Sequence, residues 1–145
     1  SMLNGMCMMS KLLLDTHILI WALTKSDELS SEVKEAIKLA KANKNLYLAS
    51  ISLWEIAMLA QKQRISVYRR IADFLQTIEH IRGLNILQIT ANIAAESVTL
   101  PGGIHNDPAD RIIIASCREI SATLVTRDQK ILDWANLGHM KTFRG

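Results

Sequence analysis

The sequence places four acidic residues where the strands of a parallel sheet would end or where a helix would begin: Asp15, Glu55, Asp110 and Asp128. Asp15 ends the first apolar run, Glu55 follows the second by five residues, and Asp128 follows the fourth by two. Ligand sites in open α/β sheets form outside the carboxyl ends of the strands, so these three carboxylates can converge on one cleft. Asp110 joins them only if its helix points its N-terminus into the same cleft, which the sequence alone does not establish.

Four carboxylates that share a cleft would repel one another, and they cannot all stay ionised without cations between them. Mg²⁺, or Mn²⁺ as its substitute, meets this requirement because hard cations prefer oxygen ligands. Such an ion can activate a water molecule, orient a scissile phosphate and stabilise the leaving oxygen. The sequence has no glycine-rich phosphate loop, and Cys117 lies in an apolar stretch typical of a core residue. The four acids therefore favour metal-assisted chemistry on a phosphate substrate.

Most of these acids also have an ordinary structural explanation. Ser52 and Glu55 have the spacing of a capping box, in which Glu55 reaches back to the Ser52 amide. Asp107 stands at an N-cap position, with Asp110 in the first turn of the same helix. Asp128 follows a threonine that could itself be a cap. The acid that ends the first strand has no such explanation, and the joint placement at strand ends favours a site over four separate caps.

A basic stretch follows the segment that carries Glu55. No acidic residue occurs from Ile56 to Ala72, and four basic residues lie within it: Lys62, Arg64, Arg69 and Arg70. The formal net charge of +3 and the pI near 9.0 mildly favour a polyanionic partner. Taken on its own, the stretch is better explained by a solvated helix face, and contact with a nucleic acid becomes the interpretation only if the cleft acts on phosphates.

Short apolar runs alternate with helical periods along the chain. Strands are expected at 11–15, 46–50, 85–90 and 122–126, with a further short strand near 140–143. Helices are expected after the first strand, around 33–40, from Ser52 to Gln61, and over 71–78, 93–98 and 112–117. Strands that alternate with helices indicate an α/β fold with a mostly parallel sheet.

The totals fit one folded unit. At 145 residues, with 49% hydrophobic and 21% charged residues, the chain is long enough to bury a single core. We expect residues 11–145 to form this domain and residues 1–10 to be a flexible N-terminal segment or a cloning remnant. The apolar run 12–23 is too short to cross a bilayer and is interrupted by Asp15. Cys7 and Cys117 are too few for a disulfide framework, which favours a cytoplasmic location.

Four segments in order resemble the motifs of the PIN domain, and more narrowly those of VapC-type toxins of type II toxin–antitoxin pairs. The segments are Leu12-Leu13-Leu14-Asp15-Thr16-His17, Ser52-Leu53-Trp54-Glu55-Ile56-Ala57, His105-Asn106-Asp107-Pro108-Ala109-Asp110-Arg111 and Leu124-Val125-Thr126-Arg127-Asp128. Each motif alone is weak. The four together, correctly ordered from about Lys11 to the C-terminus, are a specific signal, and no acid of the pattern is missing.

The resemblance implies a three-layer α/β/α fold with a central sheet of four or five strands. It implies hydrolysis of RNA phosphodiester bonds with one or two divalent ions, a homodimer, no membrane association, and inhibition by a small cognate antitoxin. On this pattern the catalytic and metal-binding residues are Asp15, Glu55, Asp110 and Asp128, and the basic stretch would bind RNA.

Four neighbouring residues take secondary places in this interpretation. Asp107 is expected as the N-cap that orients the helix of Asp110, and it could reach the metal through water. Thr16 would support the first acid through its hydroxyl. His105 is more typical of a hydrogen-bond partner than of a ligand. Arg111 would pair with a phosphate or, in our preferred interpretation, with a neighbouring acid.

Two other classes of protein compete with a nuclease. A receiver-type phosphoacceptor domain is also α/β with acids at strand ends, but it needs a lysine after a late strand, where this chain has Asp128. A catalytically inactive RNA-binding or scaffold domain of the same fold would be expected to have lost at least one acid of the pattern. The sequence retains all four.

Overall fold

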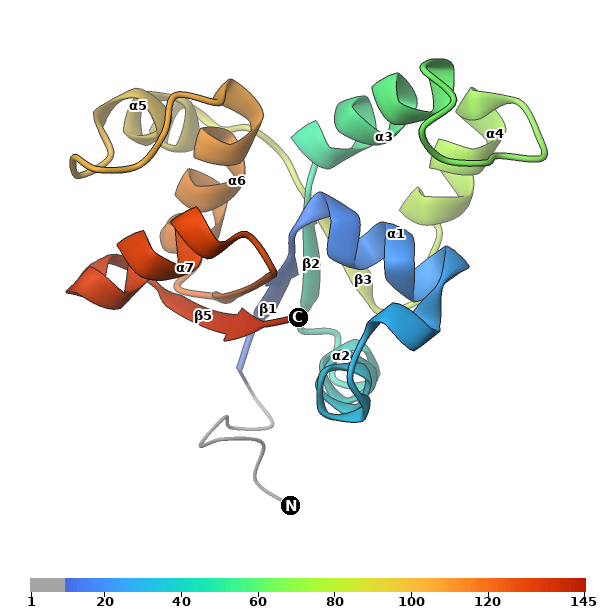
Figure 1. Ribbon diagram of the computed structural model, residues 1–145, viewed down its shortest axis with the longest axis horizontal. Helices are drawn as coiled ribbons and strands as arrows, with labels where there is room; N and C mark the ends of the chain where they lie inside the picture. The colour runs from blue at the N-terminus through green and yellow to red at the C-terminus, as the bar shows by residue number, and fades with distance from the viewer. Residues whose placement is uncertain (1–9) are drawn as a thin grey trace.

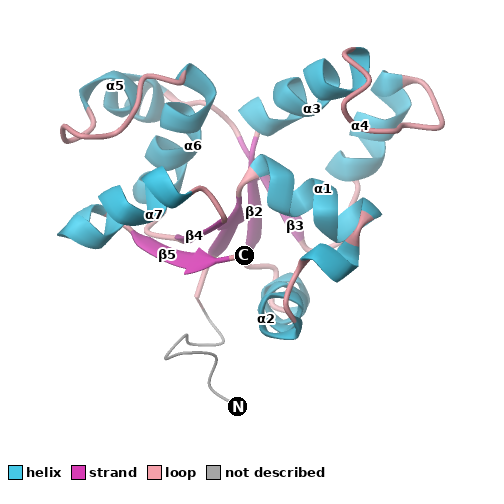
Figure 2. Ribbon diagram, in the orientation of Figure 1, coloured by secondary structure: helices cyan, strands magenta, loops and turns pink. Residues whose placement is uncertain are grey.

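The computed structural model describes residues 10–145, and within them one five-stranded sheet lies between two layers of helices (Figures 1 and 2). The strands follow the order β3-β2-β1-β4-β5, and every neighbouring pair is parallel. Their bounds are β1 (Leu12–Leu14), β2 (Leu46–Ala49), β3 (Leu84–Leu87), β4 (Thr123–Thr126) and β5 (Lys141–Arg144). The predicted three-layer α/β/α fold is confirmed, and the sheet is parallel throughout.

Seven α-helices in the described residues connect and cover the strands. They are α1 (Thr16–Thr24), α2 (Ser31–Ala42), α3 (Ile51–Gln61), α4 (Ile71–Glu79), α5 (Ala91–Thr99), α6 (Pro108–Glu119) and α7 (Gln129–Trp134). A 3₁₀ turn (η1, Ser26–Glu28) follows α1, and a π turn (η2, Ala135–His139) follows α7. Helices α1 to α4 lie on one side of the sheet, and α5 to α7 lie on the other (Figure 1).

The central strand β1 supplies both faces of the core. Successive side chains of a strand point to opposite faces. Leu12 and Leu14 accordingly pack with α1, α2, α3 and α4, while Leu13 packs with α6 and α7. Each of the three leucines is at most 1% exposed. A run of three leucines is therefore what a strand covered on both faces requires.

The order of the strands brings the predicted strand ends together. The chain forms β1, β2 and β3 in one direction, then crosses to add β4 and β5 on the other side of β1. The three strands that precede the acids are β2, β1 and β4, and they are direct neighbours. The reversal between β1 and β4 is the kind of position where open parallel sheets bind their ligands.

Two details of the predicted elements are wrong. The strand expected over 85–90 ends at Leu87, because the Thr90 side chain accepts a hydrogen bond from the Ile93 N–H and caps α5. Helix α3 begins at Ile51, one residue before the predicted start. The short helix α7 has no counterpart among the expected elements, whereas the short final strand is present as β5.

Residues 1–9 lie outside the described part of the chain. They include Cys7 and nearly all of the segment 1–10 that the sequence sets apart, so that division of the chain stays a prediction. Cys117 is buried, and burial raises the pKa of its thiol to about 12, as expected of a core cysteine. Between residues 10 and 145, no helix is both long enough and apolar enough to span a bilayer.

The packing of β1 generates a stability prediction. Leu13→Ala removes a fully buried side chain that packs between the sheet and α6, and it should lower the free energy of unfolding by about 2–5 kcal/mol. Leu137→Ala is the matched control because Leu137 is 73% exposed, and it should change that free energy little. Urea denaturation measures both variants, and equal midpoints would contradict the assignment of Leu13 to the core.

Candidate active site

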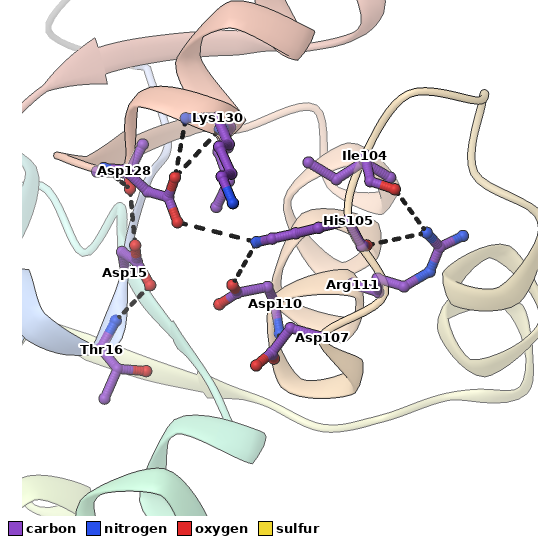
Figure 3. A network of polar contacts seen from close by, with 11 residues as sticks. Asp15, Thr16, Ile104, His105, Asp107, Asp110, Arg111, Asp128 and Lys130 are labelled. Carbon is purple, nitrogen blue, oxygen red and sulfur yellow. Dashed lines mark hydrogen bonds and ion pairs between the residues drawn. The ribbon is translucent and has the colours of Figure 1, made fainter.

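The four predicted acids line one cleft of about 450 Å³ at the carboxyl ends of the central strands. Asp107 lines it as a fifth carboxylate, and the remaining walls include His17, Trp21 and Arg127. Figure 3 shows Asp15, Asp110 and Asp128 directed toward a common space from different elements. The sequence left open whether the helix of Asp110 points its N-terminus into this cleft. The N-terminus of α6 does face it, since Asp107 and Asp110 both line the cleft. The metal-binding and catalytic roles of the acids stay predictions.

Both carboxylate oxygens of Asp15 accept a hydrogen bond, one from a backbone N–H and one from a side-chain hydroxyl. It caps α1, with Oδ1 accepting a hydrogen bond of 2.8 Å from the Thr16 N–H. Oδ2 accepts one of 2.7 Å from the Thr126 hydroxyl, across the β1–β4 pair. Burial raises the pKa of Asp15 although both hydrogen bonds oppose the shift. The expectation that Asp15 has no capping role is therefore wrong.

Glu55 reaches the cleft from the second turn of α3 and does not form the expected capping box. The N-cap of α3 is Ser50, which makes no side-chain capping bond, and Ser52 is fully buried inside the helix. Glu55 Oε1 instead accepts a hydrogen bond of 2.5 Å from the Thr16 hydroxyl. Burial raises the pKa of Glu55, and this hydrogen bond opposes the shift.

Thr16 links two of the acids in a way that differs from the expectation. Its hydroxyl oxygen lies 2.8 Å from the Ser52 hydroxyl oxygen. A hydroxyl carries one proton and an ionised carboxylate only accepts, so Ser52 donates to Thr16 and Thr16 donates to Glu55. The Thr16 hydroxyl therefore supports Glu55, while its backbone N–H supports Asp15.

Asp107 and Asp110 open α6 as the sequence predicts. Asp107 is the N-cap, its Oδ1 accepts a hydrogen bond of 3.0 Å from the Asp110 N–H, and Pro108 occupies the first turn. The Asp110 side chain is then directed into the cleft (Figure 3). Burial, together with the negative charges of the other four carboxylates, raises the pKa of Asp110 to about 7.

Asp128 caps the helix that the sequence did not predict. Its Oδ1 accepts hydrogen bonds from the N–H groups of Lys130 and Ile131 at the start of α7. The Asp128 N–H in turn donates to the Thr126 hydroxyl over 3.1 Å. Because Thr126 also donates to Asp15, one threonine couples the ends of β1 and β4. Asp128 Oδ2 is left facing the cleft (Figure 3).

His105 lies between two of the acids. Its Nε2 is 3.0 Å from Asp110 Oδ2 and 3.9 Å from Asp128 Oδ2. Within the described residues Arg111 pairs with no acid, so our preferred interpretation of it was wrong. Its guanidinium donates to the backbone carbonyls of Ser97, Ile104 and His105, which ties the loop of His105 to α6 (Figure 3).

The roles of Thr126, which donates to Asp15, and of Arg127, which lines the cleft, were not predicted from the sequence. Thr126 stands two residues before Asp128 at the end of a predicted strand, which is the signal that could have identified it. Arg127 donates to the carbonyls of Glu28 and Gly145, and its guanidinium lies 4.4 Å from the centroid of the Trp21 ring. Those contacts join segments far apart in the sequence, so no local pattern indicates them.

The basic stretch divides into two parts in the structure. Arg64 and Arg69 line a groove of about 770 Å³ between α1, α4 and the segment that connects α3 to α4. This groove shares His17 and Trp21 with the acidic cleft, so the two hollows adjoin. Arg70 is exposed and paired with Asp73 at 3.0 Å, and neither Arg70 nor Lys62 lines the groove.

The raised pKa of Asp110 predicts an unusual pH dependence for the metal-free protein. Between the unfolded pKa near 3.9 and the folded pKa of about 7, the folded state binds more protons than the unfolded state. The free energy of unfolding contributed by this group therefore falls as the pH rises through that window. Asp110→Asn should flatten the dependence and raise stability in EDTA at pH 7.5.

Exposed Asp27 provides the control, since Asp27→Asn should leave the pH dependence unchanged. Thermal unfolding of the three proteins between pH 4.5 and 8 measures the effect. If the stability of the wild type and that of Asp110→Asn changed in parallel with pH, this would contradict the raised pKa of Asp110.

Comparison with known proteins agrees with this geometry. The sequence profile of the PIN domain matches residues 12–137. Ribonuclease VapC22 of Mycobacterium tuberculosis (strain ATCC 25618 / H37Rv) is 36% identical over 124 residues, which cover 85% of this chain and 91% of that protein.

Solved structures share the fold at lower identity. A crystal structure of VapBC2 from Rickettsia felis bound to a promoter DNA fragment aligns with a TM-score of 0.67 at 20% identity, over 91% of this chain and 96% of that chain. A toxin–antitoxin complex from Klebsiella pneumoniae aligns with a TM-score of 0.61 at 24% identity, over 92% and 97% of the two chains. With a family profile that spans most of its length and a relative 36% identical over 85% of it, the chain belongs to the PIN-domain family.

Proposed function

We propose that this protein is a divalent-metal-dependent endoribonuclease that acts as the toxin of a toxin–antitoxin pair. The observation that carries the proposal is the cleft in which Asp15, Glu55, Asp107, Asp110 and Asp128 meet. A structural role explains single caps but does not explain why five carboxylates face one space. The sequence relative named as a ribonuclease supports hydrolysis of RNA in particular.

The donor set of the cleft fits a hard divalent cation. Burial raises the pKa of Asp15, Glu55 and Asp110, so the ionised cluster is unfavourable on its own. A cation between the carboxylates offsets this repulsion, and Mg²⁺ or Mn²⁺ is the ion that oxygen ligands favour. Asp15, Asp110 and Asp128 would hold the ion, with Glu55 and Asp107 beside it. When bound, it would supply a Lewis acid and lower the pKa of a water molecule.

The protein's own residues have separate tasks in this account. Thr126 fixes Asp15, and Thr16 fixes Glu55, each through a hydroxyl hydrogen bond that orients one carboxylate oxygen. Glu55 would accept the proton of the attacking water; in support, its second oxygen has no hydrogen bond within the described residues. The adjoining groove with Arg64 and Arg69 would hold the RNA backbone next to the acids.

Three further properties belong to the same proposal. The solved structures with this fold include toxin–antitoxin complexes, which supports a cognate antitoxin as partner. Trp54 on α3 is 53% exposed and Val98 on α5 is 76% exposed, which supports a homodimer that covers apolar surface. A protein of this kind would act in the cytoplasm, where its RNA is. Sedimentation of the purified chain, alone and with its antitoxin, tests both assemblies.

An inactive RNA-binding or scaffold domain is the alternative. Such a protein would keep the basic groove without needing charged, buried acids. The presence of five carboxylates in one cleft, with the pKa of Asp15, Glu55 and Asp110 raised, favours catalysis over this alternative.

Glu55→Gln separates the two functions. The amide oxygen can still accept the Thr16 hydrogen bond, so folding should be preserved, while the loss of charge should reduce RNA cleavage by about 100-fold or more. Cleavage of total RNA with Mg²⁺ or with EDTA, followed by mapping of the cut ends, provides the measurement. Exposed Glu35→Gln on α2 is the control. Equal activity of Glu55→Gln and the wild type would mean that Glu55 has only a structural role.

The groove yields a second prediction. Arg64→Ala combined with Arg69→Ala should weaken RNA binding for all sequences and lower the salt dependence of binding by about two ions or less. Arg70→Ala should have a smaller effect because Asp73 already pairs with this side chain. Affinities are measured at several salt concentrations in a Glu55→Gln background, so that the RNA stays intact. If the salt dependence of RNA affinity were unchanged while antitoxin binding became weaker, the groove would be a site for a protein partner.

A further inference from the structure

Within residues 10–145, His105 is the one nitrogen donor that lies against the acids in a geometry suited to a metal ion. Among the described residues, His105, Asp110 and Asp128 offer three ligand atoms that all lie within 4.8 Å of one another. Figure 3 shows the imidazole between the two carboxylates, with Nε2 directed at both. The side chains are 26%, 20% and 34% exposed, so none of them is on the open surface. Asp110 and Asp128 line the cleft, and His105 lies against both of them.

The shorter of the two distances from His105 Nε2 matches the distance between neighbouring ligands in a coordination shell, and the longer one lies between the values for neighbouring and opposite ligands. Around an ion with bonds of about 2.1 Å, neighbouring ligands of an octahedron lie about 3.0 Å apart and opposite ligands about 4.2 Å apart. His105 Nε2 lies 3.0 Å from Asp110 Oδ2 and 3.9 Å from Asp128 Oδ2. An ion could therefore contact all three atoms after small movements of the side chains.

The backbone around His105 is fixed by contacts that do not involve the acids. Arg111 donates to the carbonyl of His105 over 3.2 Å and to that of Ser97 over 2.8 Å. The bonds anchor the loop to α6, the same helix that begins with Asp110. The histidine and the carboxylate are thus held on one rigid unit, as a pre-formed ligand pair requires.

The polar contacts of the ring are all on one side. His105 Nδ1 is buried and has no hydrogen-bond partner within residues 10–145. The orientation of the ring therefore rests on the contact of Nε2 with Asp110.

From this geometry we propose that His105 Nε2 is a ligand of the metal ion held by Asp110 and Asp128. The inference rests on the metal site of the proposed function and deepens it. A nitrogen ligand changes the ion that the site prefers, because imidazole suits transition metals whereas an oxygen-only site suits Mg²⁺. The site would then bind Mn²⁺ or Co²⁺ in marked preference to Mg²⁺, and the expectation that His105 is only a hydrogen-bond partner would be wrong.

Pulsed electron paramagnetic resonance of the Mn²⁺-loaded full chain tests the bond directly. Coordinated imidazole produces a ¹⁴N modulation of the Mn²⁺ signal, whether or not the protein is active. The wild type should show this modulation, and His105→Gln should lose it while still binding Mn²⁺ through the carboxylates. His17→Gln is the matched control, because His17 also lines the cleft but does not belong to the three-donor group.

Metal affinities provide a second readout. Calorimetric titration should show that His105→Gln lowers the affinity for Co²⁺ by about tenfold or more, and lowers the affinity for Mg²⁺ much less. His17→Gln should leave the ratio of the two affinities unchanged.

The possible results separate the two proposals. Bound Mn²⁺ without ¹⁴N modulation in the wild type, or modulation that disappears only in His17→Gln, would overturn the role of His105 and leave the nuclease proposal standing. A wild type that binds no divalent ion would overturn the metal dependence itself, and the ligand assignment with it. Modulation that is lost only in His105→Gln, with the change in metal preference, supports the inference.

Discussion

The repulsion among carboxylates at the ends of β1, β2 and β4 is the constraint on which the rest of the structure depends. A parallel sheet with its order reversed at β1 brings these strand ends together, and the acids that follow them cannot move apart. Removal from water makes their ionised forms unfavourable, as the pKa of about 7 for Asp110 records. The fold therefore holds these carboxylates together although their ionised forms are unfavourable there, and a bound cation would offset this unfavourable free energy.

Hydroxyl groups and helix ends partly compensate this cost. Thr126 and Thr16 each donate a hydrogen bond to one acid, and the N–H groups at the start of α1 and α7 do the same for Asp15 and Asp128. Helix N-termini carry partial positive charge, which favours carboxylates placed there. Asp15, Asp107 and Asp128 are therefore both helix caps and residues of the cleft, so the structural and functional explanations of these acids do not exclude each other.

Local sequence patterns predicted the mostly parallel α/β sheet, its strands and the acids at the strand ends, because these features depend on apolar periodicity and on residues at strand ends. The three-layer arrangement was implied by the resemblance to PIN domains, and the convergence of Asp110 with the other acids was left open. The patterns failed where the partner is distant in the sequence. Glu55 has the spacing of a capping box, yet Thr16, 39 positions away, is its partner. Arg111 lies next to an acid, yet it binds backbone carbonyls of a loop that only the folded chain brings near. The roles of His105 and of the groove with Arg64 and Arg69 likewise depend on how α6 and α4 pack.

The central claim is that the carboxylate cleft binds a divalent cation, and diffraction from crystals grown with millimolar Mn²⁺ tests it most directly. Anomalous scattering identifies the ion without reference to activity. The account predicts an anomalous peak in the cleft within about 2.5 Å of carboxylate oxygens of Asp15, Asp110 or Asp128. Well-ordered acids with no peak between them, in a crystal whose cleft is open to solvent, would contradict it.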